Sequence, residues 1–138
     1  MKKLKLVTLV TLGFLIGSHT VSAKEVRVYN WTDYIDPELI VEFTDKTGIK
    51  VIYDTFDSNE VLLAKTLTGN SGYDIVVPSD YTLMYMIEAG VVEPIDKTRL
   101  SNIGNIWPYV EERLDALQGV NDYSVPYMWG TTGNGAAL

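Results

Sequence analysis

Two short segments of the sequence combine aromatic rings, hydroxyls and carboxylates, a mixture that suits a cationic organic ligand. Aromatic rings attract cations over their faces, and each contact contributes about 0.5–2 kcal/mol. Carboxylate and hydroxyl oxygens accept hydrogen bonds from ammonium groups. Sugar sites use the same rings and carboxylates, so these residue types alone do not select the ligand class. The candidate ligand-binding residues are Trp31, Thr32, Asp33 and Tyr34 in the first segment and Ser79, Asp80 and Tyr81 in the second.

Each of these residues also has a purely structural interpretation. Asp33 could cap a following helix, and Ser79 could do the same for another. Asp80 could serve the first turn of that second helix, where the helix dipole favours an acid. The aromatic rings could pack in an ordinary core. Position in the fold must therefore decide between ligand binding and local structure.

Composition excludes catalysis that depends on cysteine or on a Ser-His-Asp triad. The chain has no cysteine, and its single histidine, His19, lies near the start. Disulfide and thiol chemistry are therefore excluded, and the usual general base and zinc ligand are missing beyond that point. We expect a binding protein without catalytic residues, metal ligands or a cofactor. A hydrolase built on two carboxylates remains compatible with the composition and would need them about 5–10 Å apart.

The first 23 residues have the three-part pattern of a secretory signal peptide. Lys2, Lys3 and Lys5 precede an apolar run over residues 6–16, and residues 21–23 are small residues typical of a cleavage site. A bilayer-spanning helix takes about 20 apolar residues, so the run is too short to span a membrane. No cysteine follows it to carry a lipid. The pattern predicts residues 1–23 as a signal peptide and a soluble protein outside the cytoplasm; a first core strand or helix is the alternative.

The part of the chain after the signal is strongly acidic. Three of the 11 basic residues lie within residues 1–23, which leaves eight against 18 acidic residues, a net charge of −10. This charge disfavours binding to nucleic acid or to an anionic membrane surface and permits a cationic ligand. The same acidity could also serve only to keep a secreted protein soluble.

Strands and helices are expected to alternate along residues 25–90. Strand patterns occupy residues 25–29, 50–56 and 74–77, and the last is the continuous apolar run of a buried parallel strand. Asp36, Pro37 and Glu38 predict a helix start, Gly48 predicts its end, and the helix carries Leu39, Ile40 and Phe43 on one face. Alternating elements of this length predict an α/β fold, with a mostly parallel sheet flanked by helices.

Two further helices are expected after the second and third strands. Residues 58–60 open one of them, and Ser79 is expected to cap the other, which Gly90 closes. Beyond Gly90 the pattern weakens. It predicts a short strand over residues 91–94, a turn of helix over 96–100, an irregular helix over 107–117 and an extended segment over 123–129.

The strand order decides where a ligand would bind. In open parallel sheets, ligands bind beyond the carboxyl ends of the strands, at the point where the strand order reverses. With the order 2-1-3, that point lies between the first and third strands. The segments that follow these strands are residues 30–34 and 78–81, the two that hold the candidate ligand residues.

Five blocks of the sequence are similar to a known family, in the family's order and at similar spacing. They are residues 29–35, 47–51, 56–60, 73–81 and 126–133. The sequence resembles the periplasmic spermidine/putrescine-binding proteins of polyamine ABC transporters, and the resemblance covers nearly all of residues 24–133. It implies a two-lobed periplasmic protein whose cleft closes on a polyamine, and whose closed form docks on a membrane permease driven by an ATPase.

The resemblance implies roles for individual residues. Trp31 and Tyr34 would be ring walls of the cleft, and Thr32, Asp33 and Ser79 would be polar contacts. The full-length protein would be a monomer without stable membrane insertion.

The resemblance leaves the preferred polyamine open. Tyr81 lies where spermidine-preferring members carry a ring and putrescine-preferring members carry a smaller residue. Residues 56–73 and 127–129 look closer to the putrescine type.

In the family, a second lobe supplies most of the acids that hold the ammonium groups, and the first lobe is completed by chain that returns afterwards. Residues 24–138 are thus expected to be an incomplete N-terminal lobe, and the uncapped end over residues 130–138 reads as an interruption. The alternatives left open are a solute-binding protein of the same fold for a sugar, amino acid or metal complex, and a non-functional truncated fragment.

Overall fold

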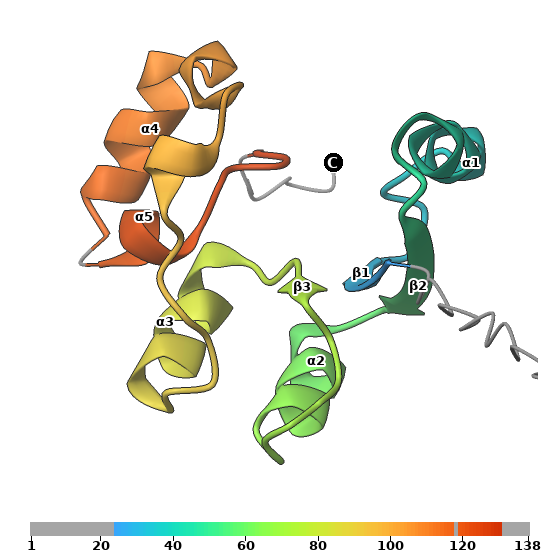
Figure 1. The fold of residues 1–138 in the computed structure, drawn as a ribbon. Coiled ribbons are helices and arrows are strands. Elements are labelled where there is room, and N and C mark those ends of the chain that lie inside the picture. Colours follow the sequence, from blue (N-terminus) through green and yellow to red (C-terminus); the bar gives the residue numbers. More distant parts are fainter. Residues whose placement is uncertain (1–23, 118, 131–138) are drawn as a thin grey trace, which may run out of the picture.

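The computed structural model describes residues 24–117 and 119–130 (Figure 1). The expected signal peptide over residues 1–23 and the chain end over residues 131–138 lie outside these ranges. Within the described part, none of the helices combines the length and apolar character that a bilayer crossing needs.

The sheet has the order 2-1-3, the condition on which the expected ligand position depended. Strand β1 (Glu25–Trp31) lies between β2 (Lys50–Phe56) and β3 (Ile75–Val76), and both pairings are parallel. The predicted bounds of β2 are confirmed, whereas β1 continues two residues beyond its predicted end at Tyr29. This extension places Trp31 beside Phe56 at the carboxyl edge of the sheet.

The helices that connect the strands lie on both sides of the sheet. Helix α1 (Pro37–Thr47) joins β1 to β2, and α2 (Asn59–Thr66) joins β2 to β3. Figure 1 shows α1 on one side and α2 with α3 (Asp80–Glu88) on the other. Parallel crossovers are right-handed, and the two connections run in opposite directions across the sheet, so their helices must cover opposite faces.

Local capping explains the first helix. The Asp36 carboxylate accepts a hydrogen bond from the backbone N–H of Glu38 at 2.9 Å, and Pro37 is the first helical residue. Gly48 ends the helix with φ +69° and donates its backbone N–H to the carbonyl of Thr44. Glycine adopts this left-handed conformation without steric cost, so both predicted ends of the helix are confirmed.

The buried core lies between the sheet and the helices of the α2 side. Phe56 stacks edge-on against Tyr29, with ring centroids 4.8 Å apart, and Tyr73 lies parallel to Tyr29 at 4.5 Å. The core therefore fixes the carboxyl ends of β1 and β2 relative to α2 and α3. Its buried apolar residues are Tyr29, Phe56, Leu62, Leu83, Met86 and Val120.

The opposite face is much less covered by the described residues. Helix α1 has no buried residue among them, and the predicted apolar side chains Leu39 and Phe43 are 52% and 42% exposed. Strand β3 also departs from expectation, because Ile75 is half exposed instead of buried. Within the described chain β3 pairs only with β1 and lies at the edge of the sheet, which leaves Ile75 without a neighbour on that side.

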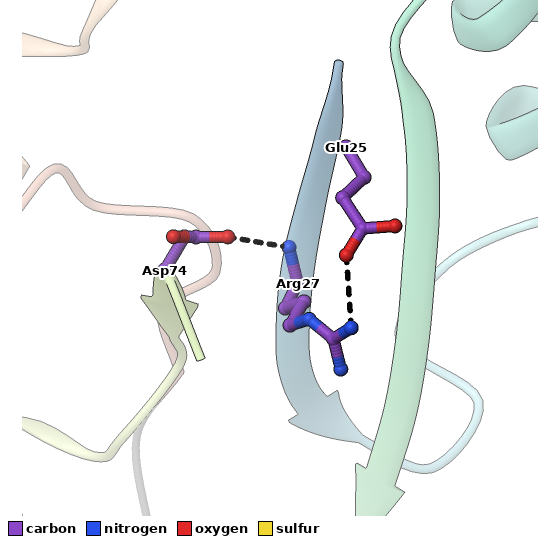
Figure 2. A network of polar contacts seen from close by, with 3 residues as sticks. All are labelled: Glu25, Arg27 and Asp74. Atoms are coloured by element: carbon purple, nitrogen blue, oxygen red, sulfur yellow. Dashed lines mark hydrogen bonds and ion pairs between the residues drawn. The ribbon is translucent and has the colours of Figure 1, made fainter. Parts of the chain in front are cut away.

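Polar contacts at the amino end of the sheet hold β3 in register (Figure 2). The Asp74 carboxylate accepts a hydrogen bond from the backbone N–H of Arg27 at 2.8 Å, and Asp74 donates its own N–H to the Arg27 carbonyl. The Arg27 guanidinium pairs with Glu25 at 2.8 Å, an exposed ion pair of the kind that adds little stability. The backbone bonds at Asp74 extend the contact between β1 and β3 beyond the two residues of the short strand.

The region after α3 differs from the prediction in two places. Residues 91–94 form no strand; instead, the Ile95 N–H donates to the carbonyl of Asp122 at 2.8 Å, which ties this segment to α5 (Val120–Tyr123). Tyr123, expected to be extended, ends that helix, and residues 124–130 have no regular structure. The predicted helical turn and irregular helix are confirmed as η1 (Lys97–Arg99) and α4 (Pro108–Asp115), with the short η2 (Ile103–Asn105) between them.

Candidate ligand-binding site

The loop after β1 turns sharply over the end of β2. The backbone N–H and the hydroxyl of Thr32 both donate to the carbonyl of Phe56, at 3.1 and 3.2 Å. Asp33 follows with φ +62°, a left-handed conformation that aspartate tolerates better than most residues. Asp33 does not cap α1, because Asp36 performs that function. Asp33 is exposed, and its carboxylate is not used to cap a helix.

Two of the predicted ring walls lie together. The rings of Trp31 and Tyr34 have centroids 6.0 Å apart and are tilted by 33°. Trp31 is half-buried and packs on Phe56 at 4.7 Å, while Tyr34 is exposed. The core thus anchors one ring, and the turn presents the other to solvent.

Tyr127 joins this ring pair from a distant part of the chain. Its hydroxyl donates a hydrogen bond to the backbone oxygen of Tyr34, and the two rings lie 6.5 Å apart. Sequence reasoning did not include Tyr127 among the site residues. Its only signal was membership of the block of resemblance at residues 126–133.

The loop after β3 corrects the role predicted for Ser79. Ser79 precedes α3 in extended conformation, but its side chain makes no capping hydrogen bond. Its hydroxyl accepts a hydrogen bond from the side-chain amide of Asn59 at 3.0 Å. The same amide nitrogen donates to the Tyr81 hydroxyl at 2.6 Å, so Asn59 joins two predicted site residues. Sequence reasoning placed Asn59 at a helix start and within the block of resemblance at residues 56–60, and did not include it among the site residues.

Asp80 takes the structural role considered for it. Its carboxylate accepts a hydrogen bond from the backbone N–H of Tyr81 at 2.7 Å, in the first turn of α3. An acid at this position is favoured by the positive end of the helix dipole. The side chain is exposed, so its negative charge also contributes to the field at the carboxyl edge of the sheet.

The predicted residues form two groups that start side by side. Strands β1 and β3 are neighbours, and the Val77 N–H donates to the Tyr29 carbonyl at 3.0 Å, just before the two loops begin. One group consists of the loop after β1 with Phe56 and Tyr127. The other consists of Ser79 and Tyr81 with Asn59. The first group includes Phe56, the last residue of β2, and the second includes Asn59, three residues further, so the end of β2 contributes to both groups.

The electrostatics of this edge are negative. Burial, followed by the charges of Asp54 and Asp57, raises the pKa of the Tyr29 phenol above its usual value. Asp57 directly follows β2, and Asp33 and Asp80 follow the other two strands; all three are exposed. A cation near this edge would be attracted, and an anion repelled.

A groove rich in aromatic residues lies next to the predicted site. It shares one residue, Tyr127, with the surroundings of that site. The rings of Trp107, Tyr109 and Trp129 lie 5.4–6.0 Å from one another. None of the seven predicted ligand residues lines the groove, although Tyr127 belongs both to it and to the ring pair. The groove is lined by Asn105, Ile106, Trp107, Val110, Pro126, Tyr127, Met128 and Trp129.

The chemistry of these groups is that of binding. Among residues 24–117 and 119–130 there is no cluster of three histidine, cysteine or acidic side chains placed to hold a metal ion. The site offers aromatic faces, hydroxyls and exposed carboxylates at the carboxyl edge of a parallel sheet. This arrangement suits recognition of a small polar or cationic solute.

The fold and this edge of the sheet are those of a solute-binding protein, and the family comparison agrees. Residues 28–134 match the model of the bacterial extracellular solute-binding proteins, and the chain belongs to this family.

Relatives within the family are named for polyamines. The chain is 50% identical over 112 residues to the putrescine-binding periplasmic protein SpuD of Pseudomonas aeruginosa, covering 81% of this chain and 30% of that protein. It is 42% identical over 120 residues to the putrescine-binding periplasmic protein PotF of Escherichia coli, covering 87% and 32%. The chain thus spans about a third of the length of these relatives.

Solved structures show the same fold. The spermidine/putrescine ABC transporter substrate-binding protein PotD of Streptococcus pneumoniae superposes with a TM-score of 0.71 at 42% identity, covering 78% of this chain and 32% of that one. A putative spermidine/putrescine ABC transporter protein of Listeria monocytogenes gives 0.70 at 45% identity, covering 78% and 33%. These similarities confirm the predicted α/β class with a parallel sheet flanked by helices.

Proposed function

We propose that this protein binds polyamines, spermidine or putrescine, outside the cytoplasm and delivers them to an ABC-type uptake transporter. The observation that carries the proposal is that the ring pair of Trp31 and Tyr34 and the hydroxyl pair of Ser79 and Tyr81 belong to the ends of two neighbouring strands, β1 and β3. Relatives named for putrescine support it at 42–50% identity, and a solved structure named for spermidine and putrescine supports it at 42%.

The geometry suggests how a polyamine would be held. The methylene chain would lie against the rings of Trp31 and Tyr34, and an ammonium group over a ring face would gain about 0.5–2 kcal/mol. The hydroxyls of Thr32 and Ser79 and the carboxylate of Asp33 would accept ammonium hydrogens. Asp80 would contribute mainly through its charge, because one of its oxygens already accepts a bond from Tyr81.

The wider role follows from the family. We assign residues 1–23 to a signal peptide and residues 24–138 to an incomplete N-terminal lobe of a periplasmic, monomeric protein. Its partners would be the polyamine and the permease of the transporter, with no nucleic acid and no stable insertion into the membrane. The relatives are solute-binding transport proteins, and the proposal includes no catalysis.

Calorimetric titration with spermidine and then putrescine tests the proposal. The titration uses the full-length protein that the gene encodes, because the present chain spans about a third of the length of its relatives. Trp31→Ala should weaken binding at least tenfold, since it removes the anchored ring wall; about 1.4 kcal/mol corresponds to tenfold. Trp107→Ala is the matched control, because it removes an exposed tryptophan outside the site loops and should leave the affinity unchanged.

Each outcome has a clear meaning. Tight binding that depends on Trp31 and not on Trp107 supports a polyamine receptor, and the order of affinities tests whether Tyr81 favours spermidine. Absence of heat with either polyamine, from a protein shown by circular dichroism to be folded, would overturn the polyamine assignment. The ligand would then be sought among the neutral solutes that proteins of this fold bind. A neutral ligand would not need the carboxylates of Asp33 and Asp80 to face it.

A further inference from the structure

We infer that Asn59 is a positioning residue that holds Ser79 and Tyr81 in the arrangement used for ligand binding. The inference rests on the proposed function and adds to it a residue outside the predicted ligand set. Asn59 opens α2, yet its side chain is directed to the loop after β3, 20 residues further along the chain.

Three hydrogen bonds define this role. The side-chain nitrogen of Asn59 lies 3.0 Å from the Ser79 hydroxyl and 2.6 Å from the Tyr81 hydroxyl. The side-chain oxygen accepts the backbone N–H of Ser79 at 3.3 Å. Asn59 is 7% exposed, so solvent does not readily replace these partners.

The chemistry of the partners fixes which way the amide points. The backbone N–H of Ser79 can only donate, so the amide oxygen must face it. The nitrogen then faces the two hydroxyls and can give one hydrogen to each. Both hydroxyls keep their own hydrogen and a remaining lone pair for a ligand.

Tyr81 is the residue that most needs such a tether. It is 54% exposed, so its neighbours restrain the ring only in part. A hydrogen bond at the far end of the side chain limits the rotamers of the ring before ligand arrives. Ordering a side chain in advance improves affinity, because its entropy is no longer lost on binding.

A merely structural role for Asn59 in starting α2 is already filled by its neighbour. The Ser58 hydroxyl accepts the backbone N–H of Val61 at 3.3 Å and caps the helix. Ser58→Ala is therefore the matched control: it removes a polar side chain at the same helix start and leaves the bonds of Asn59 in place.

A double-mutant cycle on polyamine affinity tests the inference in the protein as its gene encodes it. Asn59→Ala should raise the Kd about tenfold, the effect expected for one to two neutral hydrogen bonds. In the Tyr81→Phe, Ser79→Ala background, the further loss should be clearly smaller, because both tethered hydroxyls are gone and only the bond to the Ser79 N–H remains. Ser58→Ala should lower stability and leave the Kd unchanged. An undiminished further loss in that background would overturn the positioning role.

A second test uses NMR spectroscopy, needs no ligand and leaves the buried Asn59 side chain unchanged. Tyr81→Phe removes one hydroxyl from an exposed ring, and the side-chain amide resonances of Asn59 in a ¹⁵N-labelled protein should shift. The amide resonances of the exposed Asn102 should not move. Unchanged Asn59 resonances would overturn the inference. Absence of polyamine binding by the unaltered protein would overturn the proposed function and this binding role together, while the resonances would still report the tether.

Discussion

Tyr127 donates a hydrogen bond from its hydroxyl to the backbone oxygen of Tyr34, across 93 residues of sequence. The contact ties residues 124–130 to the loop that follows β1, where Tyr34 pairs with Trp31. The loop is thus held from two sides, by Thr32 on the Phe56 carbonyl and by Tyr127 on the Tyr34 carbonyl.

Removal of this bond should weaken ligand binding. Tyr127→Phe keeps the ring and loses the donor, so the loop after β1 gains freedom that binding must remove. A neutral hydrogen bond contributes about 1 kcal/mol, which corresponds to about fivefold in Kd. Tyr85→Phe is the control, since Tyr85 is 60% exposed on α3. Equal Kd values for the two variants in calorimetric titration would contradict the prediction.

The cap of α1 should carry measurable stability. Asp36→Ala removes the carboxylate that accepts the Glu38 N–H, and the loss should be about 1 kcal/mol of unfolding free energy. Asp45→Ala replaces another exposed aspartate of the same helix, away from its start, and should cost nothing. Urea unfolding followed by circular dichroism measures both, and a cap variant as stable as the control would show that the bond contributes nothing.

A side chain at Gly48, the residue that ends α1, should lower the stability of the protein. Gly48→Ala puts a Cβ on a backbone with φ +69°, which costs about 1–2 kcal/mol although no neighbouring atom lies within 4 Å of that Cβ. Gly104→Ala meets equally open space and has no positive φ, so it should be neutral or slightly stabilising. The comparison of their unfolding midpoints isolates the backbone term; similar midpoints would mean that the left-handed turn is unimportant.

Tyr73 should make stability depend on pH in the alkaline range. Burial, followed by the hydrogen bond to Asp54 and the charge of that carboxylate, raises the pKa of Tyr73 from 10.0 to about 12. The folded protein then holds this proton more tightly than the unfolded chain. The contribution to stability is complete below pH 10 and is lost as the pH rises toward 12.

A spectrophotometric titration of tyrosinate absorbance checks this assignment. Asp54→Asn should lower the pKa of Tyr73 toward 10.0, so the alkaline loss of stability should become smaller and end at a lower pH. The lowering should be partial, because burial remains the largest cause. Asp45→Asn, remote in sequence on α1, should leave the titration unchanged. If the alkaline transition is the same in Asp54→Asn as in the unaltered protein, burial alone sets the pKa of Tyr73.

Local sequence signals predicted much of the fold. Asp36 with Pro37, and Gly48 eleven residues further, marked both ends of α1, because capping and left-handed turns depend on neighbours only a few residues away. The alternating pattern also predicted the parallel sheet, whereas the order 2-1-3 was a condition of the site prediction that the structure meets. The same order placed the loops with Trp31 and Ser79 at one edge of the sheet.

Side-chain partners across the fold were decided only by the tertiary structure. Ser79 has the residue type and position of a helix cap, yet its hydroxyl lies against Asn59. Residues 91–94 have a strand pattern but no strand beside them in the described chain, and the next backbone N–H, that of Ile95, bonds to α5 instead. The sequence by itself determined elements whose hydrogen bonds are local. Contacts such as Tyr127 with Tyr34 depend on how the sheet and loops pack, because nothing within a few residues of either one specifies its partner.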